Sequence, residues 1–181
     1  MRTLRTLFLL LVLTLSVACK EKKPQLVSDP ITGAHIVVPR DFRVGPILKG
    51  NDEANSLLKL QASNVFKDIG VGVVMESKED IAEKLTLDRY IEIASENRAK
   101  NIKNAARSEH VARTVDGLPG VQETVRGAAG TGNVVYMILY LESPTHFYQV
   151  TAWTAPSRLT ANRAVMQSIL DSFGVTPTGS Q

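Results

Sequence analysis

The chain has 181 residues, of which 44% are hydrophobic and 22% are charged, and it carries a single cysteine. This composition is typical of one globular domain and excludes a disordered, collagen-like or coiled-coil chain. One cysteine also excludes a disulfide framework and a cysteine-rich metal site, because both need several sulfur atoms at defined spacings.

The first segment of the chain, residues 1–18, has the layout of a bacterial secretory signal. Arg2 and Arg5 supply a positive start, and an apolar run of twelve residues follows at positions 7–18. A membrane-spanning helix needs about 20 apolar residues, so this run is too short to cross a bilayer. We therefore expect residues 1–18 to be a signal peptide that is removed.

The end of this segment, Leu15-Ser16-Val17-Ala18-Cys19, resembles the lipobox of bacterial lipoproteins, with Ser16 where that family most often has Leu. The resemblance implies that Cys19 is acylated and anchors the protein to the membrane. In Gram-negative lipoproteins, a Lys after the cysteine, here Lys20, implies the periplasmic side of the outer membrane. The alternative is an ordinary secretory signal that is cut elsewhere and leaves Cys19 as a free thiol.

The mature chain would carry nearly balanced charge, because removing residues 1–18 leaves 19 basic against 18 acidic residues. Such a surface lacks the concentrated positive field that drives nucleic-acid binding, so we expect no nucleic-acid partner. The polar stretch 20–25 predicts a solvated linker. We assign residues 19–29 to a lipidated tether, 30–175 to a single domain, and 176–181 to a flexible tail.

The first part of this domain has the pattern of β-strands. Residues 34–38 form a β-branched run that Pro39 ends, and segments 56–62 and 69–76 alternate as a pair of strands should. Gly70 and Gly72 fall on one face of the second strand of this pair. That face offers no side chain, which predicts that another element approaches it closely.

A helix is predicted from Leu87 to Ile102, with Thr86 as its N-cap. Its apolar stripe consists of Leu87, Tyr90, Ile91, Ala94 and Ile102. We expect the charged residues of the helix to lie on the exposed side and to keep the surface soluble; these are Glu92, Glu96, Arg98 and Lys100.

The second half of the chain predicts an antiparallel meander followed by a helix. A turn cluster at 116–120 precedes strands at 121–126, 133–141 and 146–153, and the glycine-rich stretch 127–133 is expected to be a hairpin loop. Residues 133–141 are apolar at odd and even positions alike, so this strand should be covered on both faces. The last helix is expected at 158–173, ending before Gly174.

The order of these elements resembles the PsbP-like fold, and three short segments, at 38–42, 147–151 and 170–173, carry the resemblance. Photosystem II extrinsic proteins, a nuclear-import Ran-binding factor and bacterial envelope lipoproteins of the DcrB type share this fold. The resemblance implies the α+β class. It also implies an α/β/α sandwich, with a mainly antiparallel sheet of about six strands and helices on both faces. It further implies a non-enzymatic module that binds other proteins or steadies an envelope assembly.

No pattern in the sequence indicates a reaction. His35, His110 and His146 lack the spacing of a metal site, and the chain has neither a Gly-x-Ser-x-Gly elbow nor a Ser-x-x-Lys helix start. The stretch 127–133 precedes a strand, so no helix N-terminus is present to bind a phosphate there. We therefore expect no catalytic residue, no metal ligand and no cofactor.

Five aromatic residues gather in two neighbouring predicted strands: Tyr136, Tyr140, Phe147, Tyr148 and Trp153. Core packing explains such a cluster most simply, and a ligand-binding cleft is the alternative. Our leading hypothesis is a lipid-anchored envelope module that binds or assembles an envelope protein partner. The rival hypothesis is a small-ligand carrier or cryptic enzyme with an aromatic pocket, and a purely structural envelope protein is a third.

Overall fold

The computed structural model describes residues 23–45, 57–81, 84–130 and 132–176. The expected signal peptide, Cys19, and the expected tail beyond Thr176 lie outside these ranges. None of the helices in the described ranges is long and apolar enough to cross a membrane.

A large antiparallel sheet of eight strands forms the centre of the molecule, with the order β3-β4-β5-β10-β9-β8-β6 and with β7 paired beside β6 on β8. The predicted pair β4–β5 and the predicted hairpin β9–β10 are confirmed by their pairing registers. The strand bounds are β3 Arg43–Val44, β4 Leu58–Asn64, β5 Ile69–Ser77, β6 Lys103–Arg107, β7 Val111–Val115, β8 Leu118–Ala129, β9 Gly132–Glu142 and β10 His146–Thr154.

A second, smaller sheet consists of β1 (Gln25–Ser28), β2 (Ala34–Val38) and β11 (Gly174–Val175), in the order β1-β2-β11. The predicted strand 34–38 is therefore present, but it belongs to this small sheet. Strand β1 falls within residues 19–29, which we expected to be tether, so the folded part begins earlier than predicted. Its side chains alternate between buried and exposed too briefly for the sequence pattern to reveal the strand.

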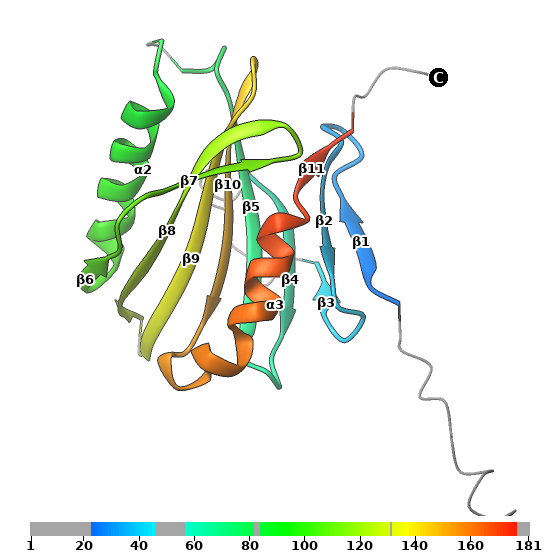
Figure 1. The fold of residues 1–181 in the computed structure, drawn as a ribbon, viewed down its shortest axis with the longest axis vertical. Helices are drawn as coiled ribbons and strands as arrows, with labels where there is room; N and C mark the ends of the chain where they lie inside the picture. The colour runs from blue at the N-terminus through cyan, green and yellow to red at the C-terminus, as the bar shows by residue number, and fades with distance from the viewer. Residues whose placement is uncertain (1–22, 46–56, 82–83, 131, 177–181) are drawn as a thin grey trace, which may run out of the picture.

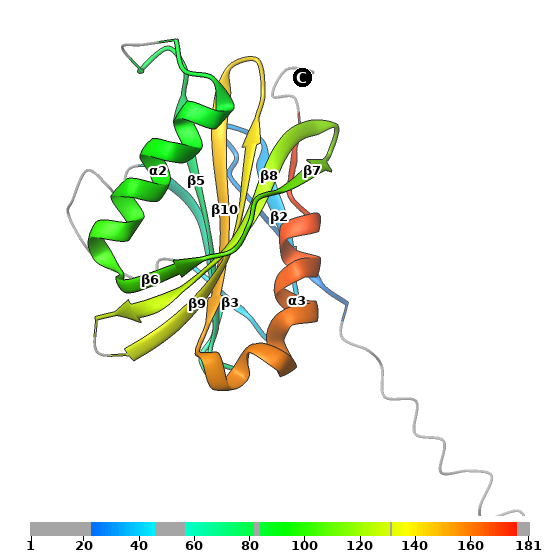
Figure 2. The ribbon, with the colours of Figure 1, turned by 60° about the vertical axis from the view of Figure 1, so that its left-hand side comes forward.

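Two helices cover opposite faces of the large sheet (Figures 1 and 2), as the resemblance implied. Helix α2 (Leu87–Asn101) lies on one face, whereas α3 (Leu159–Asp171) shares the other face with the small sheet. The expected sandwich is thus only partly matched, because a β-sheet takes part of one outer layer. Within the described residues the large sheet has eight strands instead of about six, and the small sheet adds three more.

Each face of the large sheet has its own hydrophobic core. Met137, Leu139 and Leu141 of β9 pack toward α3 and the small sheet, while Ile138 and Tyr140 of the same strand pack toward α2. These five side chains are at most 2% exposed. The prediction that this strand is covered on both faces is confirmed.

The ends of the helices follow the sequence signals. Thr86 caps α2 by accepting a hydrogen bond from the backbone N of Arg89, as predicted. A short 3₁₀ turn, η2 (Pro156–Arg158), precedes α3, so the α-helix begins one residue later than expected. The helix ends at Asp171, two residues before the predicted end, and Gly174 pairs with His35 of β2.

Two segments depart from the expected meander. Strands β6 and β7, which the sequence analysis did not predict, pair one after the other with β8. All five residues of β6 are exposed, so no apolar alternation marks this strand. Strand β8 continues to Ala129 and β9 starts at Gly132, so strands occupy much of the expected loop at 127–133.

The close approach predicted at Gly70 is made by the side chain of Trp153, which lies opposite Gly70 in the β5–β10 pair. A Cβ atom on Gly70 would lie 2.3 Å from two carbons of the indole ring. The bare backbone of Gly70 is therefore what allows Trp153 to lie flat across the sheet.

We predict that Gly70→Ala lowers the free energy of unfolding by about 1–3 kcal/mol, because the new methyl group overlaps the indole. Gly132→Ala is the matched control, since a Cβ on Gly132 meets nothing within 4 Å. Urea denaturation of both variants measures the effect. Equal midpoints for the two variants would contradict the contact between Gly70 and Trp153.

Candidate functional site

A cleft of about 640 Å³ lies between α2 and the large sheet. Apolar side chains of α2, of the segment before it and of β9 form most of its walls, and polar groups from the sheet and the helix lie among them. The residues that line it are Glu76, Ile81, Leu85, Tyr90, Ile93, Ala94, Asn97, Arg98, Asn101, Ile102, Ala129, Tyr136 and Gln149. Its volume is in the range of small-ligand pockets.

The polar groups of this cleft form one connected network. The Tyr90 hydroxyl donates to Glu76 Oε1 at 2.7 Å, and Gln149 Nε2 donates to the Tyr90 oxygen at 2.8 Å. Gln149 Oε1 in turn accepts a hydrogen bond from Arg98 Nη2 at 3.0 Å. The network therefore connects a carboxylate on β5 to a guanidinium on α2 through β10, and it holds the polar side chains in fixed positions.

Arg98 lies against the sheet, which corrects the expectation that it is one of the solubilising charges of α2. Its guanidinium carbon is 5.7 Å from the centre of the Tyr136 ring, in cation–π geometry. Its Nε atom is buried and has no hydrogen-bond partner among the described residues. Arg98 follows Ala94 by four residues and so continues the apolar stripe, and this spacing was the sequence signal for its position.

The tyrosines around the cleft are held in their neutral form. Burial, assisted by the hydrogen bond to Glu76, raises the pKa of Tyr90 far above its usual value. Burial also raises the pKa of Tyr136 and of Tyr140, while the positive charge of Arg98 acts in the opposite direction on both. At neutral pH these hydroxyls therefore serve as hydrogen-bond donors.

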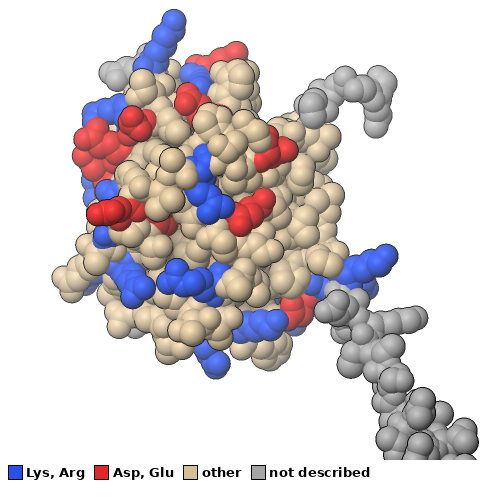
Figure 3. Space-filling model, in the orientation of Figure 1, with Lys and Arg blue, Asp and Glu red and all other residues tan. Residues whose placement is uncertain are grey.

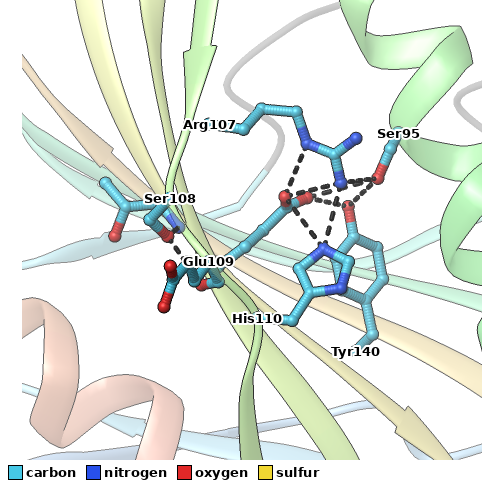
Figure 4. Close-up of polar contacts among 8 residues, drawn as sticks. Ser95, Arg107, Ser108, Glu109, His110 and Tyr140 are labelled. Carbon is cyan, nitrogen blue, oxygen red and sulfur yellow. Dashed lines mark hydrogen bonds and ion pairs between the residues drawn. The ribbon is translucent and has the colours of Figure 1, made fainter.

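A second polar cluster lies at the other side of α2, around the carboxylate of Glu123 on β8, whose side chain is 0% exposed. Ser95, Arg107, His110 and Tyr140 converge there from α2, β6, the β6–β7 connection and β9 (Figure 4). Glu123 accepts hydrogen bonds from Arg107 Nε at 2.8 Å, from the Tyr140 hydroxyl at 2.9 Å and from Ser95 Oγ at 3.3 Å.

This Glu123 cluster is built as a structural ion pair. Arg107 Nη2 also lies 2.8 Å from Glu123 Oε2 and donates to Ser95 Oγ at 2.9 Å, so one guanidinium joins β6, β8 and α2. The cavity beside the cluster has a volume of only about 10 Å³, which leaves no room for a substrate. A buried carboxylate with this many donors stabilises the position of α2 on the sheet.

The sequence analysis missed Glu123, although a signal was present. Val121, Glu123 and Val125 share one face of β8 by the two-residue period of a strand, and both valines pack toward α2. A charged residue between two inward-facing valines indicates a buried, paired carboxylate. Arg107 lies on a strand whose residues are all exposed, so no sequence pattern pointed to this partner.

The structure separates the three histidines onto different elements: His35 is in β2, His110 follows β6, and His146 begins β10. No group of three or more metal-ligating side chains occurs within the described ranges. His110 is the one that joins a polar cluster, with Nε2 at 3.4 Å from Glu123 Oε2. The residue beside it, Glu109, accepts a hydrogen bond from Ser108 Oγ through its backbone oxygen.

The five aromatic residues of β9 and β10 divide between the two faces of the sheet. Tyr148 packs into the α3 core, 5.1 Å from the ring of Phe173. Tyr136, Tyr140 and Phe147 face α2, and Phe147 stacks on Tyr90 at 4.3 Å. Of the five, only Tyr136 lines the cleft. The aromatic cluster is therefore mainly core.

No protein-family model matches the chain, and no curated protein sequence matches it. Solved structures do share its fold. CyanoP, the cyanobacterial PsbP of Synechocystis sp. PCC 6803, aligns with a TM-score of 0.61 at 14% identity over 90% of this chain and 99% of its own. The fold is therefore PsbP-like, as the sequence resemblance implied.

Two further structures have the same fold. LpqN of Mycobacterium tuberculosis, described as involved in cell envelope biogenesis, aligns with a TM-score of 0.60 at 13% identity over 86% of this chain and 91% of its own. PA94 of Pseudomonas aeruginosa, described as a putative regulator of unknown function, aligns with a TM-score of 0.53 at 10% identity over 87% of this chain and its full length. Identities this low show the fold alone.

We predict that Arg107→Ala lowers the free energy of unfolding by about 2 kcal/mol, because it leaves the buried Glu123 carboxylate without its cation. Arg113→Ala is the control: Arg113 pairs with Asp171 across a partly exposed surface, where an ion pair contributes at most about 1 kcal/mol. Chemical denaturation of both variants measures this difference. The single variant Glu123→Gln and the double variant Arg107→Ala/Glu123→Gln complete the cycle that gives the coupling energy. Additive losses would contradict the pairing of Arg107 with Glu123.

Proposed function

We propose that this protein is a lipid-anchored, non-enzymatic binding module of the bacterial cell envelope that engages an envelope protein through the α2 cleft. The observation that carries the proposal is the cleft itself. It combines an apolar wall with hydrogen-bonding groups that are already fixed in place, which is the usual composition of a recognition surface.

The fold and the sequence support the envelope setting. The lipobox around Cys19 predicts the anchor, and Lys20 after it favours the periplasmic side of the outer membrane. The likeness to LpqN, a protein described as involved in cell envelope biogenesis, agrees with this setting. None of the three similar structures above is described as an enzyme.

The groups that line the cleft fit binding better than catalysis. The Glu76 carboxylate accepts from Tyr90 and Gln149, and the pKa of Tyr90 is raised far above neutral pH. Groups held in this way orient a ligand, while the guanidinium of Arg98 lines the cleft and carries a positive charge. A backbone carbonyl or a carboxylate of a partner would be a suitable acceptor for it.

A second candidate function is the transport of a small molecule, and the size of the cleft favours it. Its volume of about 640 Å³ matches an amphipathic small molecule whose apolar part lies against Tyr136 and whose acceptor meets Arg98. Both candidates use the same cleft. They are distinguished by what the intact protein binds: a protein partner or a small molecule.

We predict that crosslinking in intact cells, followed by mass spectrometry, recovers one stoichiometric envelope partner with the wild-type lipoprotein and loses it with Cys19→Ala. The variant should also leave the membrane fraction, because the acyl chains supply most of the affinity for the bilayer. The mass of the N-terminal peptide reports directly whether Cys19 is acylated.

Two results would contradict the proposal. An unmodified Cys19 in protein from the membrane fraction would show that Cys19 is not a lipid anchor. A small molecule retained in native mass spectrometry, with no crosslinked partner, would favour the carrier function over the assembly module.

A further inference from the structure

The turn between β4 and β5 exposes two large apolar side chains. Phe66 is 88% exposed, more than any other large hydrophobic residue in the described ranges, and Val65 beside it is 70% exposed. The turn is well ordered by hydrogen bonds, since Asn64 Oδ1 accepts from the backbone N of Phe66 and of Lys67, each at 3.1 Å. The fold therefore holds an aromatic side chain outward at a defined position.

This turn lies at the end of the molecule where the chain enters from its N-terminus. Gln25 Nε2, at the start of β1, donates to the backbone oxygen of Phe42 at 2.8 Å, in the connection between β2 and β3. In the same connection, Asp41 pairs with Lys67 of the β4–β5 turn at 2.7 Å. Figure 1 shows the N-terminal start of β1 and the β2–β3 connection toward the lower end of the molecule.

A third segment, η2 and the start of α3, completes this end. The backbone N of Ala155 donates to Asp68 Oδ2 at 2.9 Å, and Asn162 Nδ2 donates to the backbone oxygen of Lys67 at 2.8 Å. We call this surface the tether-side end. It consists of residues 23–25 at the start of β1, the β2–β3 connection together with β3, the β4–β5 turn and η2.

The tether-side end is positively charged. Its basic residues outnumber its acidic ones by five to two, and both acidic residues already accept hydrogen bonds from neighbours. Lys and Arg side chains lie along the lower margin of the face drawn in Figure 3. The basic residues are Lys23, Arg40, Arg43, Lys67 and Arg158, and the acidic ones are Asp41 and Asp68.

The opposite end has the reverse balance, with more acidic than basic residues. The acidic residues there are Asp29, Glu79, Asp80, Asp116 and Glu142, and the basic ones are Lys59, Lys78 and Lys84. Although the mature chain is nearly neutral, its charge is unevenly distributed along its long axis, with basic residues in excess at the tether-side end and acidic residues in excess at the other. A charged bilayer surface would orient such a domain.

From these observations we propose that the tether-side end docks on a bilayer surface that contains anionic phospholipid, with Phe66 inserted at the interface. The inference rests on the proposed function, because an anchor at Cys19 would hold this end beside the bilayer. The six peptide units that join Cys19 to Gln25 can span at most about 20 Å. The opposite end, by contrast, would point away from the lipid.

The chemistry of this end matches that surface. An exposed aromatic ring gains by entering the boundary between headgroups and acyl chains, where its apolar area leaves water. Basic side chains near an anionic leaflet are attracted to it over a distance of about one Debye length, roughly 8 Å at physiological salt. The exposed Phe66 and its basic neighbours act together in this way.

The test uses the unacylated chain from residue 19 with Cys19→Ser, which keeps every described residue and removes the anchor. We expect it to bind vesicles of phosphatidylethanolamine with phosphatidylglycerol and not vesicles of phosphatidylcholine alone. Cosedimentation should show binding about tenfold weaker for Phe66→Ala and about fivefold weaker for Arg158→Ala. All these side chains are exposed, so thermal unfolding should confirm unchanged stability.

Matched controls lie at the opposite end. Ile31 is 83% exposed in the β1–β2 turn, so Ile31→Ala removes a comparable apolar surface, and Lys84→Ala removes a comparable charge. Both should bind the anionic vesicles as the parent chain does. Absence of binding by the parent chain, equal losses in the controls, or full binding by Phe66→Ala would each overturn the docking surface and leave a protein partner as its occupant. None of these results bears on the acylation of Cys19, which the N-terminal peptide reports separately.

Discussion

The burial of β9 on both faces is the constraint on which the rest of the structure depends. A strand with apolar side chains on both sides must be covered twice, and the chain supplies α2 for one face and α3 with the small sheet for the other. The two covers differ in kind. The α3 side is a continuous apolar core, whereas the α2 side mixes aromatic rings with charged and amide groups.

This difference explains where the candidate site lies. Two polar systems hold α2 on the sheet, the Glu123 cluster at one side and the network of Glu76, Tyr90, Gln149 and Arg98 at the other. The Glu123 carboxylate is fully buried and the cavity beside it is too small for a substrate, so this cluster serves to hold α2 in place. The other network borders an open cleft, so it is the side suited to recognition.

The sequence predicted those elements whose signals are local or strongly periodic. The cap at Thr86, the strand 34–38 that ends at Pro39 and the doubly covered strand around Ile138 all belong to this class, and the structure confirms them. Strands β1, β6 and β11 escaped prediction because they are short or fully exposed, and only pairing with neighbours defines them. The inward positions of Arg98 and Glu123 could be inferred from spacing. Their partners, and the cleft itself, depend on which strands lie beneath α2, which no local pattern specifies.

Position-resolved photocrosslinking in living cells tests whether the α2 cleft is the recognition surface. A photoreactive amino acid at Ile93, which lines the cleft, is compared with one at Glu96, which is exposed on the same helix. We expect a discrete crosslinked product from position 93 that Arg98→Ala weakens, and none from position 96. Products of equal yield from both positions, or from position 96 alone, would contradict it.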